Sequence, residues 1–73
     1  MKLKHKQARD HIAVILSSEP DGLPTRTIVE RLKIRTKMVP HPASLSNLLF
    51  RDSRFVKVMI GRTALWRLRD EEV

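Results

Sequence analysis

The sequence has no cysteine, only two glycines and no long apolar run. Without cysteine the chain cannot form disulfides, thiolate zinc sites or iron–sulfur clusters. A membrane-spanning helix needs about 18 apolar residues, and the lysines near the N-terminus have no apolar segment behind them as in a signal peptide. We therefore expect an intracellular protein, in the cytoplasm, nucleoid or nucleus, with no membrane partner.

Residues for catalysis or metal binding are also scarce. The two glycines lie far apart, so no glycine-rich phosphate loop exists. His5 and His11 do not share a helix face, and His41 adds no metal-ligand spacing. No Ser/His/Asp set is recognisable, and so short a chain buries only about 60% of its unfolded surface, which leaves little room for a deep cleft. We expect no enzyme activity, no metal and no cofactor.

Acidic residues are few and unevenly placed. The 73 residues include 15 lysines and arginines against 8 aspartates and glutamates, a net charge of +7. Because Asp70, Glu71 and Glu72 stand together at the end, residues 1–69 carry a net charge of +10. A charge of about 2–8 is usual for solubility, so this basic excess favours a polyanionic partner. No basic helix has the broad apolar face that binds membranes, and nucleic acid is therefore favoured.

Three segments have the apolar spacing of amphipathic helices: residues 7–17, 26–32 and 42–52. Thr25 is a good N-cap for the second helix, and His41 is an unusual cap before Pro42 in the third. Residues 34–40 are not periodic and are expected to form a loop. The predicted core residues of the helices are Ala8, Ile12, Ile15, Leu16, Ile28, Val29, Leu32, Leu45, Leu48 and Leu49.

The remaining segments predict turns and strands. Pro20-Asp21-Gly22 fits the end of a type I turn, and the residue after it, Leu23, is held extended by Pro24 as a short edge strand. Residues 55–60 and 63–68 are β-branched and aromatic, and the glycine between them suits a type II′ hairpin.

The register of this hairpin has two solutions. A two-residue loop pairs Val58 with Leu65, whereas a three-residue loop pairs Val56 with Trp66. We favour the second register, because it places Val56, Val58, Trp66 and Leu68 on one face.

This order of elements predicts an α+β fold, a small winged helix-turn-helix with three helices, a short strand and a C-terminal β-hairpin as the wing. We expect one domain over residues 1–73, with a basic arm at 1–6, a folded core at 7–69 and an acidic tail at 70–73. In such folds the third helix lies in the major groove of DNA.

The segment PASLSNLLFRDSRFVKV, residues 42–58, resembles the HARE-type winged helix-turn-helix family. The likeness lies in the proline that opens the helix, in Leu-Leu-x-Arg-Asp at its end and in Arg-Phe-Val-x-Val at the start of the strand. Gly61-Arg62 followed by Trp66-Arg67-Leu68 is similar to the family's wing. The resemblance covers roughly residues 8–68 and implies a DNA-associated module.

Several polar residues are candidates for DNA contacts. Asn47 can bond adenine at N6 and N7, and Arg51 can bond guanine at O6 and N7 or pair locally with Asp52. Ser44 and Ser46 suit phosphates near the helix N-terminus. The wing candidates are Lys57, Arg62 and Arg67, and the candidates for a phosphate-contacting loop are Arg31, Lys33, Arg35 and Lys37. If that loop is extended, its cations form a row beside the third helix and Ile34 turns inward; a plain solvated surface is the alternative.

Two aromatic residues stand out. Trp66 is expected in the core, anchoring the wing on the first or third helix. Phe50 points away from the apolar stripe of its helix, and we expect it to fold over the helix end against Phe55 or the wing. Contact with a thymine methyl group or with a partner protein is the alternative.

The sequence thus predicts a double-stranded DNA-binding protein, a small transcriptional regulator or a DNA-associated accessory factor. With no long helix or heptad repeat, a monomer or weak homodimer is expected. Two alternatives stay open: a protein-interaction module that uses Phe50, Met38 and Leu65 as apolar anchors, and RNA binding through the same basic surfaces.

Overall fold

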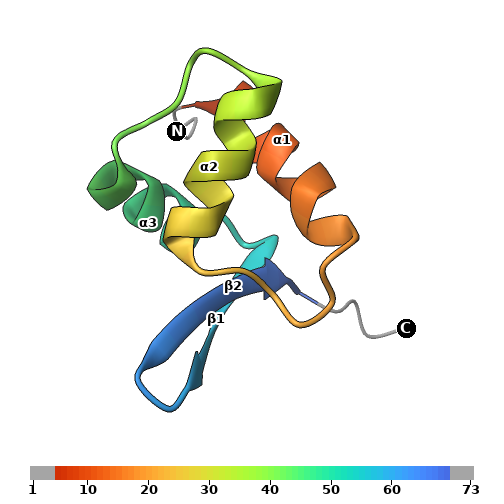
Figure 1. Cartoon of the computed structure of the whole chain (residues 1–73), viewed down its shortest axis with the longest axis vertical. Helices are drawn as coiled ribbons and strands as arrows, with labels where there is room; N and C mark the ends of the chain where they lie inside the picture. Colours follow the sequence, from red (N-terminus) through yellow and green to blue (C-terminus); the bar gives the residue numbers. More distant parts are fainter. Residues whose placement is uncertain (1–4, 70–73) are drawn as a thin grey trace.

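The computed structural model describes residues 5–69 and contains three helices followed by a hairpin (Figure 1). Residues 1–4 of the expected arm and the acidic tail 70–73 lie outside the described residues. The elements are α1 (Lys6–Ser17), α2 (Thr25–Arg35), α3 (Pro42–Arg51), β1 (Phe55–Ile60) and β2 (Thr63–Leu68). This confirms the predicted α+β fold, whose layout is that of a winged helix.

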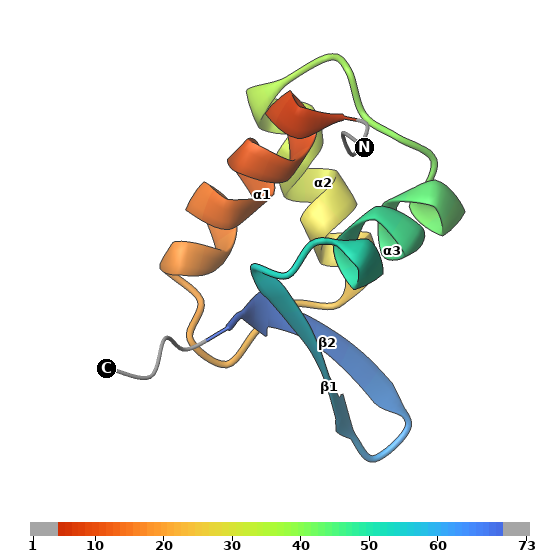
Figure 2. The same cartoon turned by 180° about the vertical axis from the view of Figure 1, so that it is seen from behind.

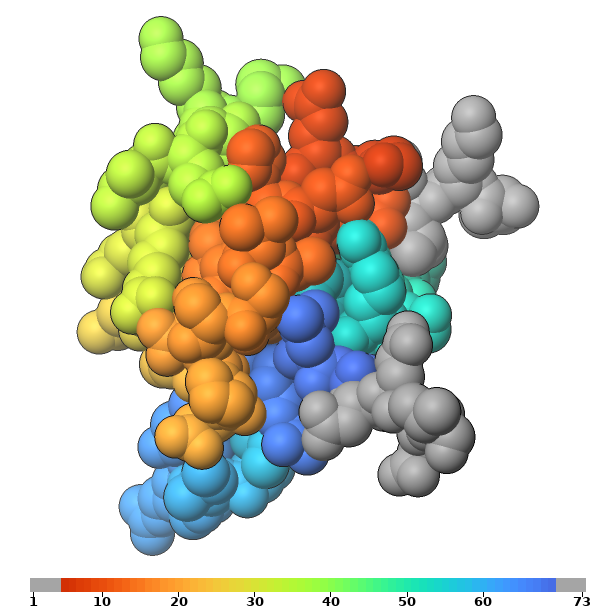
Figure 3. Space-filling model, turned by 90° about the vertical axis from the view of Figure 1, so that its right-hand side faces the viewer, coloured from red at the N-terminus to blue at the C-terminus, as the bar shows by residue number. Residues whose placement is uncertain are grey.

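The helices gather at one end of the molecule and the hairpin projects from the other (Figures 1 and 2). The apolar stripes of the three helices meet in a common core that also contains Leu23, Phe55 and Trp66. Figure 3 shows the side that α1 covers, where β2 lies against it. The largest fully buried side chains are Ile12, Leu16, Ile28, Leu32, Leu45 and Leu49. Each contributes about 1.5–3 kcal/mol through burial, and Leu48 alone among the predicted helical core residues is only half-buried.

The second helix differs from its prediction at both ends. It continues to Arg35, so the first two residues of the expected loop are helical, and Ile34 is 86% exposed rather than turned inward. Residues 33–35 lack an apolar stripe, but lysine and arginine suit the negative end of the helix dipole. Thr25 is the first helical residue rather than the cap, a position taken by Pro24.

The other helix ends are closer to expectation. His41 caps α3, since its Nδ1 accepts a hydrogen bond from the backbone N–H of Ala43 at 3.2 Å. Lys6, which the sequence placed in the basic arm, is the first residue of α1. The turn after α1 is closed as predicted, because the Gly22 N–H donates to the Glu19 carbonyl at 2.9 Å.

The favoured hairpin register is wrong. Val58 pairs with Leu65 across a two-residue turn. Gly61 there has φ +61° whereas Arg62 has no positive φ, as a type II′ turn requires. Directly paired residues share a face, so Trp66 lies with Lys57 and not with Val56 and Val58. The observed register is favoured because it places both Phe55 and Trp66 in the core.

The short edge strand at Leu23 is a single bridge to β2. Leu23 and Trp66 exchange two backbone hydrogen bonds, at 2.9 and 2.8 Å. This close approach depends on Gly22, whose φ is +89° and where an added Cβ would lie 2.8 Å from the Trp66 carbonyl oxygen. The bridge therefore ties the turn after α1 to the base of the hairpin.

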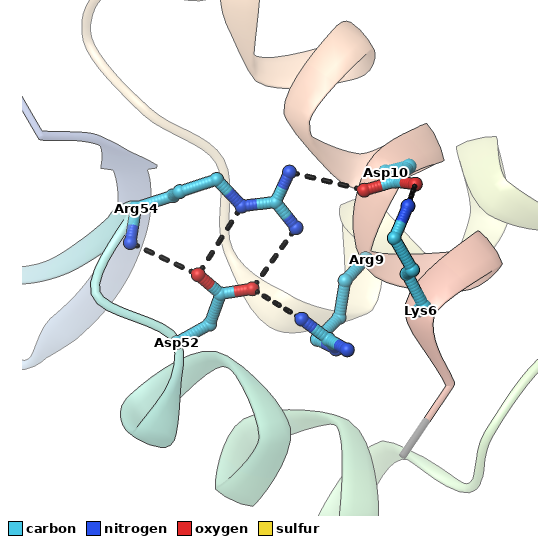
Figure 4. Close-up of polar contacts among 5 residues, drawn as sticks. All are labelled: Lys6, Arg9, Asp10, Asp52 and Arg54. Carbon is cyan, nitrogen blue, oxygen red and sulfur yellow. Dashed lines mark hydrogen bonds and ion pairs between the residues drawn. The ribbon is translucent and has the colours of Figure 1, made fainter. Parts of the chain in front are cut away.

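A buried ion pair joins α1 to the segment between α3 and β1 (Figure 4). Arg9 and Asp52 are 8% and 5% exposed, and Arg9 Nη1 lies 2.9 Å from Asp52 Oδ2. The guanidinium of Arg54 also contacts Asp52, at 3.0 Å, and reaches Asp10 at 3.0 Å. Lys6 completes the network by pairing with Asp10 at 2.7 Å. The sequence did not predict this pair, because an arginine at the edge of an apolar stripe is usually a surface residue.

The network changes the acidity of Asp52. Burial alone would raise the pKa of this carboxyl group. Hydrogen bonds from the Arg54 side chain, the Arg54 backbone N–H and Arg9 outweigh burial, and together they lower the pKa from 3.8 to about 2. Asp52 is therefore charged in the folded protein down to strongly acidic pH.

We expect Asp52→Asn to destabilise the fold by about 3–5 kcal/mol at pH 7, because the Arg9 guanidinium stays buried after its carboxylate partner is gone. Urea unfolding followed by Trp66 fluorescence measures the loss. The double variant Arg9→Met/Asp52→Leu, which removes both charges, should recover most of it. A loss below about 1 kcal/mol for Asp52→Asn would contradict the importance of this pair.

The lowered pKa of Asp52 predicts that the effect of Asp52→Asn on stability depends on pH. Because the pKa of Asp52 is lower in the folded than in the unfolded chain, its charge stabilises the fold fully above the unfolded value of 3.8. This stabilisation is lost as the pH falls from there towards 2. The stability difference between wild type and Asp52→Asn should therefore shrink over that interval, and a constant difference would refute the pKa shift.

The two glycines offer a matched comparison. Both have positive φ, but an added Cβ meets nothing within 4 Å at Gly61 and meets the Trp66 backbone at Gly22. We expect Gly61→Ala to cost about 1 kcal/mol from its φ alone and Gly22→Ala to cost about 2–3 kcal/mol. Thermal unfolding of both variants tests this order; equal losses would show that the Leu23–Trp66 bridge tolerates a side chain at Gly22.

Candidate nucleic-acid interface

The outward face of α3 carries three of the four residues of this helix that the sequence predicts as DNA contacts, Ser44, Asn47 and Arg51. Leu45 and Leu49 point into the core, so the residues on the opposite side of the helix are left in solvent. Pro42 and the His41 cap fix where this helix begins. The exposed residues of this face are Ala43, Ser44, Asn47, Phe50 and Arg51.

A shallow groove of about 280 Å³ lies between this face and the hairpin. Three predicted site residues, Ser46, Asn47 and Lys57, come together there from α3 and β1. Ser46 is half-buried, whereas Asn47 and Lys57 are exposed. The residues that line the groove are Ala43, Ser46, Asn47, Phe50, Lys57 and Trp66.

Trp66 and Thr25 hold the base of the groove. Trp66 is 3% exposed, as the sequence predicted, and its Nε1–H donates to the Thr25 hydroxyl at 3.2 Å. The same hydroxyl lies 3.5 Å from Ser46 Oγ on α3. Thr25 thus joins the start of α2 to both sides of the groove.

The electrostatics of this surface are positive. No acidic residue lines the groove, and within residues 5–69 neither Arg51 nor Lys57 takes part in an ion pair. Local pairing of Arg51 with Asp52 does not occur, because Arg9 and Arg54 occupy the Asp52 carboxylate. Both cations therefore remain available to an anionic ligand.

Phe50 does not fold back over the end of α3, contrary to expectation. The residue is 77% exposed, whereas Phe55 is buried in the core. The guanidinium of Arg54 lies 5.4 Å from the centre of the Phe55 ring. Phe50 therefore lies on the outer face of α3, where it lines the groove.

The expected row of cations beside α3 does not form. Arg31, Lys33 and Arg35 are helical, and alternate residues of a helix point in widely different directions. Arg31 pairs with Glu19 at 2.7 Å, and the Nε–H of Arg35 donates to His11 Nδ1 at 3.2 Å. These contacts place Arg31 and Arg35 against α1 and the turn after it.

Only Lys37 of the predicted phosphate-contacting set lies in the loop.

The wing candidates also separate. Arg62 is exposed in the turn at the tip of the hairpin, as predicted. Arg67 is half-buried and lines a different hollow with Leu16, Glu19 and Pro20, so it does not belong to the α3 groove. Arg26, an exposed cation that was not among the predicted site residues, follows Thr25 in the first turn of α2. A basic residue next to a helix start was the available signal.

Two further findings concern other kinds of site. Among residues 5–69, no three histidine, aspartate or glutamate side chains gather in a way that could hold a metal ion. None of the helices in this part of the chain has the length and apolar character to cross a membrane.

Comparison of the chain with protein-family models, with curated proteins and with solved structures gives no match. The resemblance to the HARE-type family thus stays a prediction from residues 42–58 and the wing. The inference of function rests on the groove and its surroundings.

We expect Thr25→Val to destabilise the protein by about 1–3 kcal/mol, because the buried indole N–H loses its acceptor while the shape of the side chain is kept. Ser46→Ala, which removes only the 3.5 Å contact, is the control and should cost about 0.5 kcal/mol or less. Urea unfolding of both variants measures the difference. Equal stability of Thr25→Val and wild type would show that Trp66 does not depend on this bond.

Proposed function

We propose that the protein binds double-stranded DNA, with α3 in the major groove and the hairpin beside the sugar-phosphate backbone. The observation that carries the proposal is the groove, where Asn47 on α3 lies beside Lys57 on β1 with no acidic residue in the lining. A helix fits the major groove of B-DNA, which is about 12 Å wide, and asparagine is a bidentate partner for adenine there.

The distribution of charge supports the same partner. Arg51 and Lys57 flank the outward face of α3, and Arg62 extends from the tip of the hairpin. Arg26 adds a cation at the start of α2, the helix whose Thr25 contacts Ser46. Phosphate contacts of this kind fix the position of a protein on DNA, whereas base contacts give sequence preference.

The proposed role is that of a small transcriptional regulator or an accessory factor on DNA, as the resemblance to the HARE-type family implies. Duplex RNA is the weaker candidate, because its deep and narrow major groove does not admit a helix such as α3. A protein-interaction module draws support from the exposure of Phe50 and Met38. Leu65, the third apolar anchor considered, is half-buried in the hairpin and less available.

The test is a salt series with a labelled DNA duplex of about 20 base pairs. Each phosphate contact adds about −0.9 to the slope of log affinity against log salt concentration. Lys57→Ala should therefore weaken binding to all duplexes and make the slope shallower by about 0.9. Arg35→Ala removes the same charge from the α1 side, where Arg35 contacts His11, and should leave the slope unchanged.

Three outcomes would contradict the proposal. Equal effects of Lys57→Ala and Arg35→Ala would show that only the net charge matters and not the α3 groove. Tighter binding of single strands or of duplex RNA under the same conditions would assign the protein to a different nucleic acid. If no nucleic acid binds at low salt, the protein-interaction module becomes the better hypothesis.

A further inference from the structure

Phe50 is the least expected side chain on the α3 face. It is 77% exposed, although Leu45 and Leu49 of the same helix are completely buried in the core. The fold gains nothing from a phenyl ring in water, since such a ring stabilises a protein only when it is buried. A binding partner that covers the ring would account for its position.

The surroundings of Phe50 indicate the chemistry of that partner. Asn47 lies one helical turn earlier and Lys57 faces it from β1, and all three line the same groove. Arg51 follows Phe50 on the exposed face. Within the groove the ring thus shares the lining with an amide, a hydroxyl and a cation, beside Ala43 and the largely buried Trp66. A docking surface for an apolar protein segment is normally a contiguous apolar patch.

If the partner is duplex DNA, one chemical group suits the exposed ring of Phe50. The edges of the bases in the major groove are polar except for the C5-methyl group of thymine, which phenylalanine can contact. Resting on the proposed function, we propose that Phe50 covers a thymine methyl group while Asn47 bonds adenine, so that the α3 face selects A·T base pairs.

The spacing along α3 allows both contacts at once. Residues three apart rise about 4.5 Å along a helix and have Cβ atoms about 5–6 Å apart. Successive base pairs are about 3.4 Å apart along one strand. The amide of Asn47 and the ring of Phe50 therefore reach base edges in the same pair or in neighbouring pairs, without a change of helix orientation.

The experiment removes the methyl group from the DNA. A preferred duplex is first selected from random sequences, and each thymine in it is then replaced by uracil, which lacks only the C5-methyl group. Wild-type protein should lose affinity by about fourfold at one or two positions, as expected for one buried methyl group. Phe50→Ala should bind the thymine and uracil duplexes equally well.

Ile34→Ala is the matched control. Ile34 is also a large apolar residue in solvent, 86% exposed on α2, and it does not line the groove. This variant should keep the wild-type loss on uracil substitution. Because Phe50 and Ile34 are both exposed, neither change is expected to unfold the protein.

The outcomes separate this inference from the proposed function. Duplex binding with a steep salt slope, but without any uracil effect, would overturn the role of Phe50 and leave DNA binding intact. A uracil effect that persists in Phe50→Ala, or a preferred site without A·T pairs, would overturn it as well. Absence of duplex binding would contradict both the role of Phe50 and the proposed function. Wild-type affinity of Phe50→Ala for every duplex is the result expected if the ring docks on a protein.

Discussion

The buried pair between Arg9 and Asp52 is the interaction on which the rest of the structure depends. Asp52 ends α3 and immediately precedes the hairpin, while Arg9 comes from the first helix. A charge this deeply buried is tolerated only when its partner is in place. The pair therefore requires α1, the end of α3 and the start of β1 to assemble together, and it sets the point from which the hairpin leaves the helices.

A second, smaller contact sets the other side of the candidate interface. Thr25 bonds the indole of Trp66 and lies against Ser46, so α2, α3 and β2 meet at one hydroxyl group. The groove between α3 and the hairpin is formed by elements that are each fixed at their buried ends. Its polar residues are consequently carried by elements that hydrogen bonds and burial hold together, as the proposed DNA binding requires.

The sequence predicted the three helices and the exposed side of α3 from apolar periodicity, and the hairpin from β-branched residues and a turn glycine. It did not predict the register, since Val56 and Val58 offer an apolar face as good as that of Phe55 until the core is known. Periodicity also treats an arginine as a surface residue, so the burial of Arg9 was invisible. The prediction of a row of cations was wrong because charged residues such as Lys33 and Arg35 are good helix formers, and they extend the helix without an apolar pattern that would reveal it.

The hairpin is fixed to the rest of the fold at its base. The two backbone hydrogen bonds between Leu23 and Trp66 and the burial of Phe55 hold the base, while Met59 and Ile60 near the tip are more than half exposed. Local opening is easiest where backbone hydrogen bonds face solvent and few side chains are buried. Amide protection should fall from root to tip, so the wing can bend to follow a curved surface while α3 keeps its place.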